Sequence, residues 1–138
     1  MKSISVFGLG YVGTVMAACL AHKGNSVIGV DLNAAKVAAM DAGRSPIVEP
    51  RVSEMIAECH RAGHLHATTD AEAAVLKTRI SFLCVGTPSL RNGKLDLGHI
   101  EPVCRQIGHA LRNKNAPSRL HTSPIKTATM ATRKKRSS

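Results

Sequence analysis

The amino-acid sequence predicts an α/β fold with a parallel sheet, and two observations carry that prediction. Short apolar segments at residues 4–7, 26–31 and 80–85 are typical of buried strands. The segments between them repeat apolar residues at helical spacing. Strands that alternate with helices are joined by right-handed crossovers, which bring neighbouring strands into parallel pairing. We therefore expect one sheet with helices on its faces.

A glycine-rich turn follows the first predicted strand and opens the first predicted helix. Gly8, Gly10 and Gly13 have the spacing GxGxxG. In this pattern the first glycine makes a tight turn, the second lets the backbone approach a phosphate, and the third lets helix and strand pack closely. The helix start offers unpaired N–H groups and the positive end of its dipole to an anion. The turn predicts a dinucleotide diphosphate site, and a purely structural glycine turn is the alternative.

Asp31 ends the second predicted strand, 18 residues after Gly13. An acid about 20 residues beyond the glycines accepts hydrogen bonds from the adenosine ribose hydroxyls. Its charge disfavours a 2′-phosphate, so the expected cofactor is NAD rather than NADP. The segment Gly86–Pro88 also follows a strand end, and the carboxyl ends of parallel strands share one edge of a sheet. The sequence thus predicts a Rossmann-like parallel sheet with its ligand at that edge.

Caps and apolar stripes predict the remaining helices. Asn33 caps a helix through Met40 that Gly43 stops, and a third helix ends at Gly63. Residues 65–68 read as a weak strand, residues 69–72 as a capping box, and residues 96–98 as the start of a last helix. The stripes expected to be buried are Val12, Val15, Met16, Cys19 and Leu20 in the first helix, Val52, Met55, Ile56 and Cys59 in the third, and Ile100, Val103, Cys104, Ile107 and Leu111 in the last.

Charge divides the chain of 138 residues into two parts. Residues 1–112 carry 12 Lys/Arg and 9 Asp/Glu, whereas residues 113–138 carry 7 Lys/Arg and no acid. We expect residues 1–112 to form the domain and residues 113–138 to be a basic, disordered tail, because Ser, Thr, Pro and cations dominate there. The sheet would then be incomplete at its C-terminal side. With few aromatic residues for base stacking, the tail predicts no specific nucleic-acid partner.

The cysteines and histidines suggest no chemistry of their own. Cys19, Cys59, Cys84 and Cys104 lie in apolar-periodic segments without a CxxC pair, which is typical of reduced, buried thiols in a cytoplasmic protein. Cys59, His60, His64 and His66 are close in sequence, but Gly63 should break the helix between the histidines, so we predict no metal site. The apolar runs are too short to cross a bilayer, and no membrane partner is expected.

The motifs together resemble the nucleotide-sugar 6-dehydrogenases. The residues that carry the resemblance are Phe7 to Gly13, Val30-Asp31, Lys36, Ser45 to Pro50, Cys84 to Pro88 and Asn92 to Gly98. Among the members, those that oxidise GDP-mannose in bacterial alginate synthesis are the most similar, and those that oxidise UDP-glucose are the alternative. The resemblance implies oxidation of a sugar C6 alcohol to a carboxylate by two hydride transfers to NAD, in an enzyme that forms homo-oligomers.

The resemblance also implies which residues contact the cofactor. These are the backbone of Tyr11 and Val12 at the pyrophosphate, Asp31 at the ribose, Lys36 on the ribose side and Thr87 at the later strand end. It implies no catalytic residue here, because none of the four cysteines matches the motif of the catalytic cysteine. The chain departs from the family after about residue 112, where no further apolar strand follows. We therefore expect a truncated or frame-shifted dehydrogenase that is inactive alone; a non-catalytic NAD- or nucleotide-binding protein is the alternative.

Overall fold

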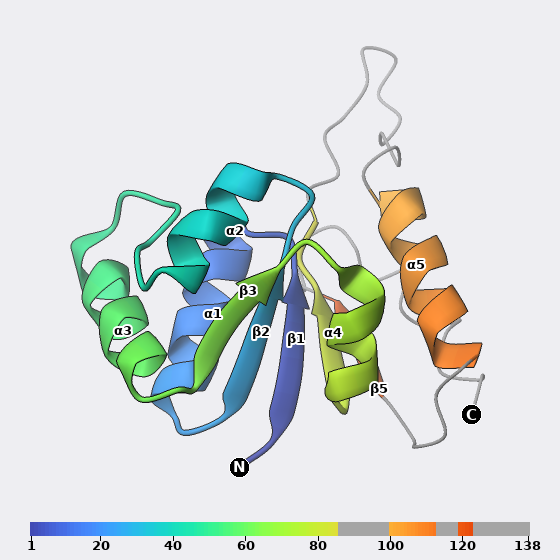
Figure 1. Cartoon of the computed structure of the whole chain (residues 1–138), viewed down its shortest axis with the longest axis horizontal. Helices are drawn as coiled ribbons and strands as arrows, with labels where there is room; N and C mark the ends of the chain where they lie inside the picture. Colours follow the sequence, from blue (N-terminus) through green and yellow to red (C-terminus); the bar gives the residue numbers. More distant parts are fainter. Residues whose placement is uncertain (86–99, 113–118, 123–138) are drawn as a thin grey trace.

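The computed structural model describes residues 1–85, 100–112 and 119–122 (Figure 1). Its five strands form one parallel sheet with the order β3-β2-β1-β4-β5. The strands are β1 (Ser3–Phe7), β2 (Ser26–Val30), β3 (Leu65–Thr68), β4 (Ile80–Leu83) and β5 (Arg119–Thr122). The chain moves from β1 outward to β3 and then returns to place β4 on the other side of β1. The predicted α/β fold with a parallel sheet is confirmed.

Helices cover both faces of this sheet (Figure 1). They are α1 (Tyr11–His22), α2 (Ala34–Asp41), α3 (Pro50–Arg61), α4 (Ala71–Lys77) and α5 (Ile100–Arg112). Ile4 and Val6 of β1 point to a core shared with α1, α2 and α3, whereas Phe7 points to a core shared with α4 and α5. This alternation follows from the two-residue period of a strand. Helices α1, α2 and α3 therefore cover one face of the sheet, and α4 and α5 cover the other. Right-handed crossovers require this arrangement, because the chain builds the sheet first to one side of β1 and then to the other.

Helix α1 packs on the sheet through a face different from the predicted one. Of the predicted stripe, Val15 and Leu20 are only partly buried against the core, and Val12 is 39% exposed. Cys19 is also exposed, so the expectation of a buried thiol is wrong there. Small side chains let the helix approach the sheet closely, and this close approach outweighs the larger apolar area of the predicted stripe. The buried face consists of Gly13, Thr14, Ala17, Ala18 and Ala21.

The predicted cap of α2 and the predicted glycines after α2 and α3 agree with the structure, whereas the predicted cap of α4 does not. Asn33 Oδ1 accepts hydrogen bonds from the backbone N–H groups of Ala35 and Lys36, at 2.9 and 3.2 Å. Gly43 after α2 and Gly63 after α3 have φ values of +80° and +81°, as expected for glycine at a helix end. At α4 the cap is Asp70 rather than the predicted Thr69, because Asp70 Oδ1 accepts from the N–H of Ala73 at 3.1 Å. The capping box is therefore wrong by one residue.

Strand β5 lies inside the segment that the sequence predicted to be disordered. Its residues pair in parallel with Ile80–Leu83 of β4. A parallel ladder is made by backbone N–H and C=O groups, so it can form without an apolar run, and it covers an edge of β4 that would otherwise be unpaired. The prediction of disorder is wrong for Arg119–Thr122. The rest of the predicted tail and the predicted helix start at residues 96–98 lie outside the described residues. In the part that is described, every helix is too short or too polar to cross a bilayer.

Candidate functional site

The carboxyl edge of the sheet contains a cavity of about 360 Å³. It lies where the strand order reverses, between the ends of β1 and β2 on one side and the segment after β4 on the other. Helix α5 contributes the wall above these strand ends. The lining residues are Phe7, Gly8, Gly10, Val30, Asp31, Leu32, Lys36, Thr69, Cys84, Val85, Pro102, Val103 and Gln106. This is the edge at which the sequence predicted a ligand.

The three glycines of the turn differ in why glycine is needed. Gly8 has a φ of +101°, and a Cβ there would lie 2.8 Å from the carbonyl oxygen of Cys84. A Cβ on Gly13 would lie 1.7 Å from the carbonyl oxygen of Gly8, which no side chain can tolerate. Among the described residues, none has a heavy atom within 4 Å of the Gly10 Cβ position, and Gly10 lines the cavity. Gly8 and Gly13 are therefore required by the fold, whereas Gly10 keeps open space at the start of α1.

Asp31 connects the glycine turn to the start of α2. Its Oδ2 accepts a hydrogen bond from the N–H of Leu9 at 2.7 Å, and its Oδ1 accepts one from the N–H of Asn33 at 2.8 Å. The N–H of Gly8 also donates to the carbonyl oxygen of Val30, at 2.7 Å. Each carboxylate oxygen can accept more than one hydrogen bond, so both keep capacity for a ligand. The carboxylate is held beside the turn in a fixed orientation.

The other predicted residues are placed unevenly around this cavity. Lys36 lines it and is half-buried, in the first turn of α2. The side chains of Tyr11 and Val12 line a separate apolar hollow on α1 instead. Any contact from these two residues must therefore come from the backbone N–H groups of the first helical turn, which have no acceptor within the helix. Thr87 lies outside the described residues.

Nine lining residues were not among the predicted site residues. Four of them, Phe7, Val30, Cys84 and Val85, lie at or just after strand ends and belong to the motifs that carried the resemblance, without a predicted contact. Thr69 directly follows β3 and Leu32 directly follows Asp31, so the rule that ligands bind at carboxyl strand ends could have found both. No local pattern places α5 over these strand ends, because that contact joins segments distant in sequence. The residues contributed by α5 are Pro102, Val103 and Gln106.

Cys84 is the cysteine that lines the cavity, and its thiol is kept protonated. Burial raises the pKa of Cys84 to about 11. Its Sγ lies 3.9 Å from the sulfur of Met16, an apolar neighbour that does not favour a thiolate. Because the thiolate rather than the thiol is nucleophilic, Cys84 does not have the properties of a reactive cysteine near neutral pH.

These features define a dinucleotide-binding domain of the Rossmann type: a glycine turn at a helix start, an acid at the end of the neighbouring strand, and a cavity where the strand order reverses. The description "UDP-glucose/GDP-mannose dehydrogenase family, NAD binding domain" belongs to a family model that matches residues 2–137. The chain therefore belongs to this family. The matched range continues past residue 112, where the resemblance in motifs stops.

Individual relatives agree with the family. GDP-mannose 6-dehydrogenase of Azotobacter vinelandii is 56% identical over 111 residues, which are 80% of this chain and 26% of the relative. The enzyme of the same name from Pseudomonas aeruginosa is 49% identical over 127 residues, 92% of this chain and 28% of the relative. The chain thus spans about a quarter of the length of these relatives.

Solved structures match the fold closely. A ternary complex of GDP-mannose dehydrogenase from Pseudomonas aeruginosa superposes with a TM-score of 0.84 at 49% identity, covering 87% of this chain and 28% of that one. A UDP-glucose dehydrogenase from Pyrobaculum islandicum superposes with a TM-score of 0.83 at 38% identity, covering 88% of this chain and 28% of that one. NAD is the cofactor of the matched domain, and the open space at Gly10 beside the Asp31 carboxylate fits it.

Proposed function

We propose that this chain is the NAD-binding portion of a GDP-mannose 6-dehydrogenase, which oxidises GDP-mannose to GDP-mannuronate by two hydride transfers to NAD. The choice of sugar is supported by identity: 56% and 49% to two GDP-mannose enzymes, against 38% to a UDP-glucose 6-dehydrogenase of Haloferax volcanii. A UDP-glucose 6-dehydrogenase is the second candidate. A non-catalytic NAD-binding module is the third.

The placement of Asp31 is the observation that carries the proposal. Its carboxylate is fixed by the N–H of Leu9 and lines the same cavity as Gly10 and Lys36. In the proposed complex the ribose hydroxyls donate to Asp31, and Lys36 lies on the ribose side. The first-turn N–H groups of α1 hold the diphosphate, helped by the helix dipole. NAD supplies the hydride acceptor when it is bound.

We assign no catalytic residue in this chain and propose that it is inactive alone. The thiol of Cys84 is protonated near neutral pH, and the exposed Cys19 lies on the outer face of α1. We also propose that residues 1–112 hold the NAD site, that the basic segment after them takes no part in it, and that the protein is cytoplasmic. The homo-oligomeric assembly of the family is not expected to be preserved in this chain. Thr87 is proposed as a further NAD contact.

Calorimetric titration of the purified chain with NAD tests the binding site. The comparison is between the wild type, Asp31→Asn and the matched control Glu54→Gln, which removes an exposed acid on α3. Loss of a charged hydrogen bond costs about 1.5–3 kcal/mol, so Asp31→Asn should weaken NAD binding by roughly tenfold or more. Glu54→Gln should bind as the wild type does, and NADP should bind less tightly than NAD. Equal affinities for NAD in all three proteins would overturn the assignment of Asp31.

Absorbance of NADH tests the reaction. The chain is mixed with NAD and either GDP-mannose or UDP-glucose, and we expect no NADH from either sugar. Formation of NADH from either would contradict the claim that the catalytic residues are absent from this chain. Formation from UDP-glucose alone would also contradict the choice of sugar.

A further inference from the structure

We propose that Asp41, His60 and His66 form a binding site for a transition-metal dication, with Zn²⁺ as the best fit, at the outer edge of the sheet. Each residue offers one ligand atom, and these atoms lie within 4.8 Å of one another. The three residues come from α2, α3 and β3, so only the folded chain brings them together. None of them lines the cavity at the carboxyl edge, which makes this a separate site.

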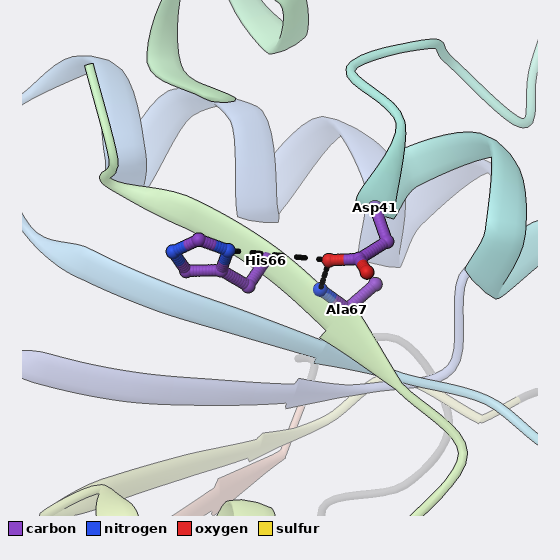
Figure 2. A network of polar contacts seen from close by, with 3 residues as sticks. All are labelled: Asp41, His66 and Ala67. Atoms are coloured by element: carbon purple, nitrogen blue, oxygen red, sulfur yellow. Dashed lines mark hydrogen bonds and ion pairs between the residues drawn. The ribbon is translucent and has the colours of Figure 1, made fainter. Parts of the chain in front are cut away.

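Asp41 is held in place by the exposed edge of β3. Its Oδ1 accepts a hydrogen bond from the N–H of Ala67 at 3.1 Å (Figure 2). Of the strands that the structure describes, β3 is the last on this side of the sheet, so none of them lies beside this N–H to bond it. The same Oδ1 lies 3.9 Å from Nδ1 of His66, whose ring points toward the carboxylate in Figure 2. One carboxylate thus covers the strand edge and faces an imidazole.

His60 supplies the third ligand from the last turn of α3. It is half-buried, and its ring lies against Gly43, where a Cβ would come within 3.2 Å of Nδ1. The rings of His60 and His66 approach edge to face, with centroids 6.1 Å apart at an interplanar angle of 66°. A glycine after α2 therefore leaves room for the imidazole of His60 to reach the cluster.

The distances are close to those a metal would need. Zn²⁺ binds imidazole nitrogen and carboxylate oxygen at about 2.0–2.2 Å, so two ligands of a tetrahedral ion lie about 3.4 Å apart. Ligand atoms up to 4.8 Å apart must therefore approach by up to about 1.4 Å. The side chains of His66 and Asp41 are 56% and 52% exposed, so side-chain rotation can supply this movement. Water would complete the coordination.

The donor set decides which ions fit. Imidazole nitrogen favours Zn²⁺, Ni²⁺ or Cu²⁺, whereas Mg²⁺ and Ca²⁺ favour oxygen ligands. An exposed ion pair of Asp41 with His66 would contribute little to the free energy of folding. Such a pair would also give no reason for His60 to lie beside these two residues. Cys59, the neighbouring candidate in sequence, is 5% exposed in the core, and burial and then the nearby Glu58 raise the pKa of its thiol. In the proposed site the carboxylate of Asp41, and not the thiol of Cys59, joins the two histidines.

Metal binding should tie α2, α3 and β3 together and stabilise the fold. The test is calorimetric titration of the full chain, freed of metal by chelation, with Zn²⁺ alone and with Mg²⁺ alone. We expect one Zn²⁺ per chain at this site and a higher unfolding temperature in its presence, since a ligand of the folded state stabilises it. Mg²⁺ should give neither effect.

Variants assign the site to its residues. His66→Gln and His60→Gln should each weaken Zn²⁺ binding at least tenfold, whereas His64→Gln, the matched control two residues from His66, should bind Zn²⁺ as the wild type does. Co²⁺ in place of Zn²⁺ should give the visible absorption of a tetrahedral ion, and His66→Gln should abolish it. The proposal is overturned if the wild type binds no Zn²⁺, if Mg²⁺ binds equally well, or if His64→Gln weakens binding as much as His66→Gln.

Discussion

Replacing Gly13 by alanine tests the packing of α1 against the glycine turn. The new Cβ would lie 1.7 Å from the carbonyl oxygen of Gly8, well inside the 3.0 Å that real Cβ atoms observe. Both groups belong to the backbone, so no side-chain rotation relieves the overlap and α1 must move away from the sheet. Overpacking in a well-packed site costs about 1–3 kcal/mol, and we expect the upper end or more because backbone must shift.

That cost is large against the total stability of a domain. About 3 kcal/mol is a substantial part of the roughly 5–15 kcal/mol by which a domain is stable. At about 4 °C per kcal/mol, the unfolding temperature should fall by roughly 10 °C or more. Thermal and urea unfolding of the wild type and Gly13→Ala measure this difference directly. A Gly13→Ala protein as stable as the wild type would show that α1 does not approach the Gly8 carbonyl as closely as the structure places it.

Gly10→Ala is the matched control within the same turn. In the part of the chain that the structure describes, no heavy atom lies within 4 Å of its Cβ position, and the φ of −79° is ordinary for alanine. Replacing glycine by alanine at the N-cap should cost less than about 1 kcal/mol, so this variant should fold. Its methyl group would enter the space proposed for the diphosphate, and NAD affinity should fall at least tenfold. Unchanged NAD affinity would place the diphosphate elsewhere.

Three further predictions concern the core, a cap and the thiols. Ile56→Ala, at a fully buried position on α3, should lower the free energy of unfolding by about 2–5 kcal/mol in urea titrations, and a loss below 1 kcal/mol would contradict its place in the core. Asn33→Ala removes the side-chain cap of α2 and should cost about 1 kcal/mol, whereas Asn33→Ser should restore most of it; equal losses would show that the cap contributes little. At pH 8 iodoacetamide should modify the exposed Cys19 before Cys84, which mass spectrometry of digests can order. Faster labelling of Cys84 than of Cys19 would contradict the burial of Cys84. Burial raises the pKa of Cys84 from 9.0 to about 11 in the folded state, so the free energy of unfolding should fall as pH rises through that range.

The sequence was most informative where local chemistry determines the conformation. The GxGxxG turn, the strand that Asp31 directly follows and the cap at Asn33 each depend on a few adjacent residues, and the structure has all three. Hydrophobic periodicity was correct for α3, whose buried residues include Val52, Ile56 and Cys59.

The sequence was misleading where tertiary packing decides. In α1 the fully buried face consists of small residues such as Ala17 and Ala18, because helix and strand approach closely at Gly13. Val15 and Leu20 of the predicted stripe are only partly buried against the core. Strand β5 forms because its backbone pairs with the edge of β4, and the pattern of its side chains does not predict this pairing. The cluster of Asp41, His60 and His66 was missed because Asp41 comes from a different helix, and only the fold brings its carboxylate to the histidines.

Amide chemical shifts during NAD titration directly test whether NAD binds at the glycine turn and Asp31. We predict saturable shifts centred on the backbone N–H groups of Leu9 to Gly13 and on Asp31 and Asn33, at the carboxyl edge of the sheet, with no comparable change near His66. Shifts confined to other parts of the chain, or none at millimolar NAD in a folded protein, would contradict this prediction.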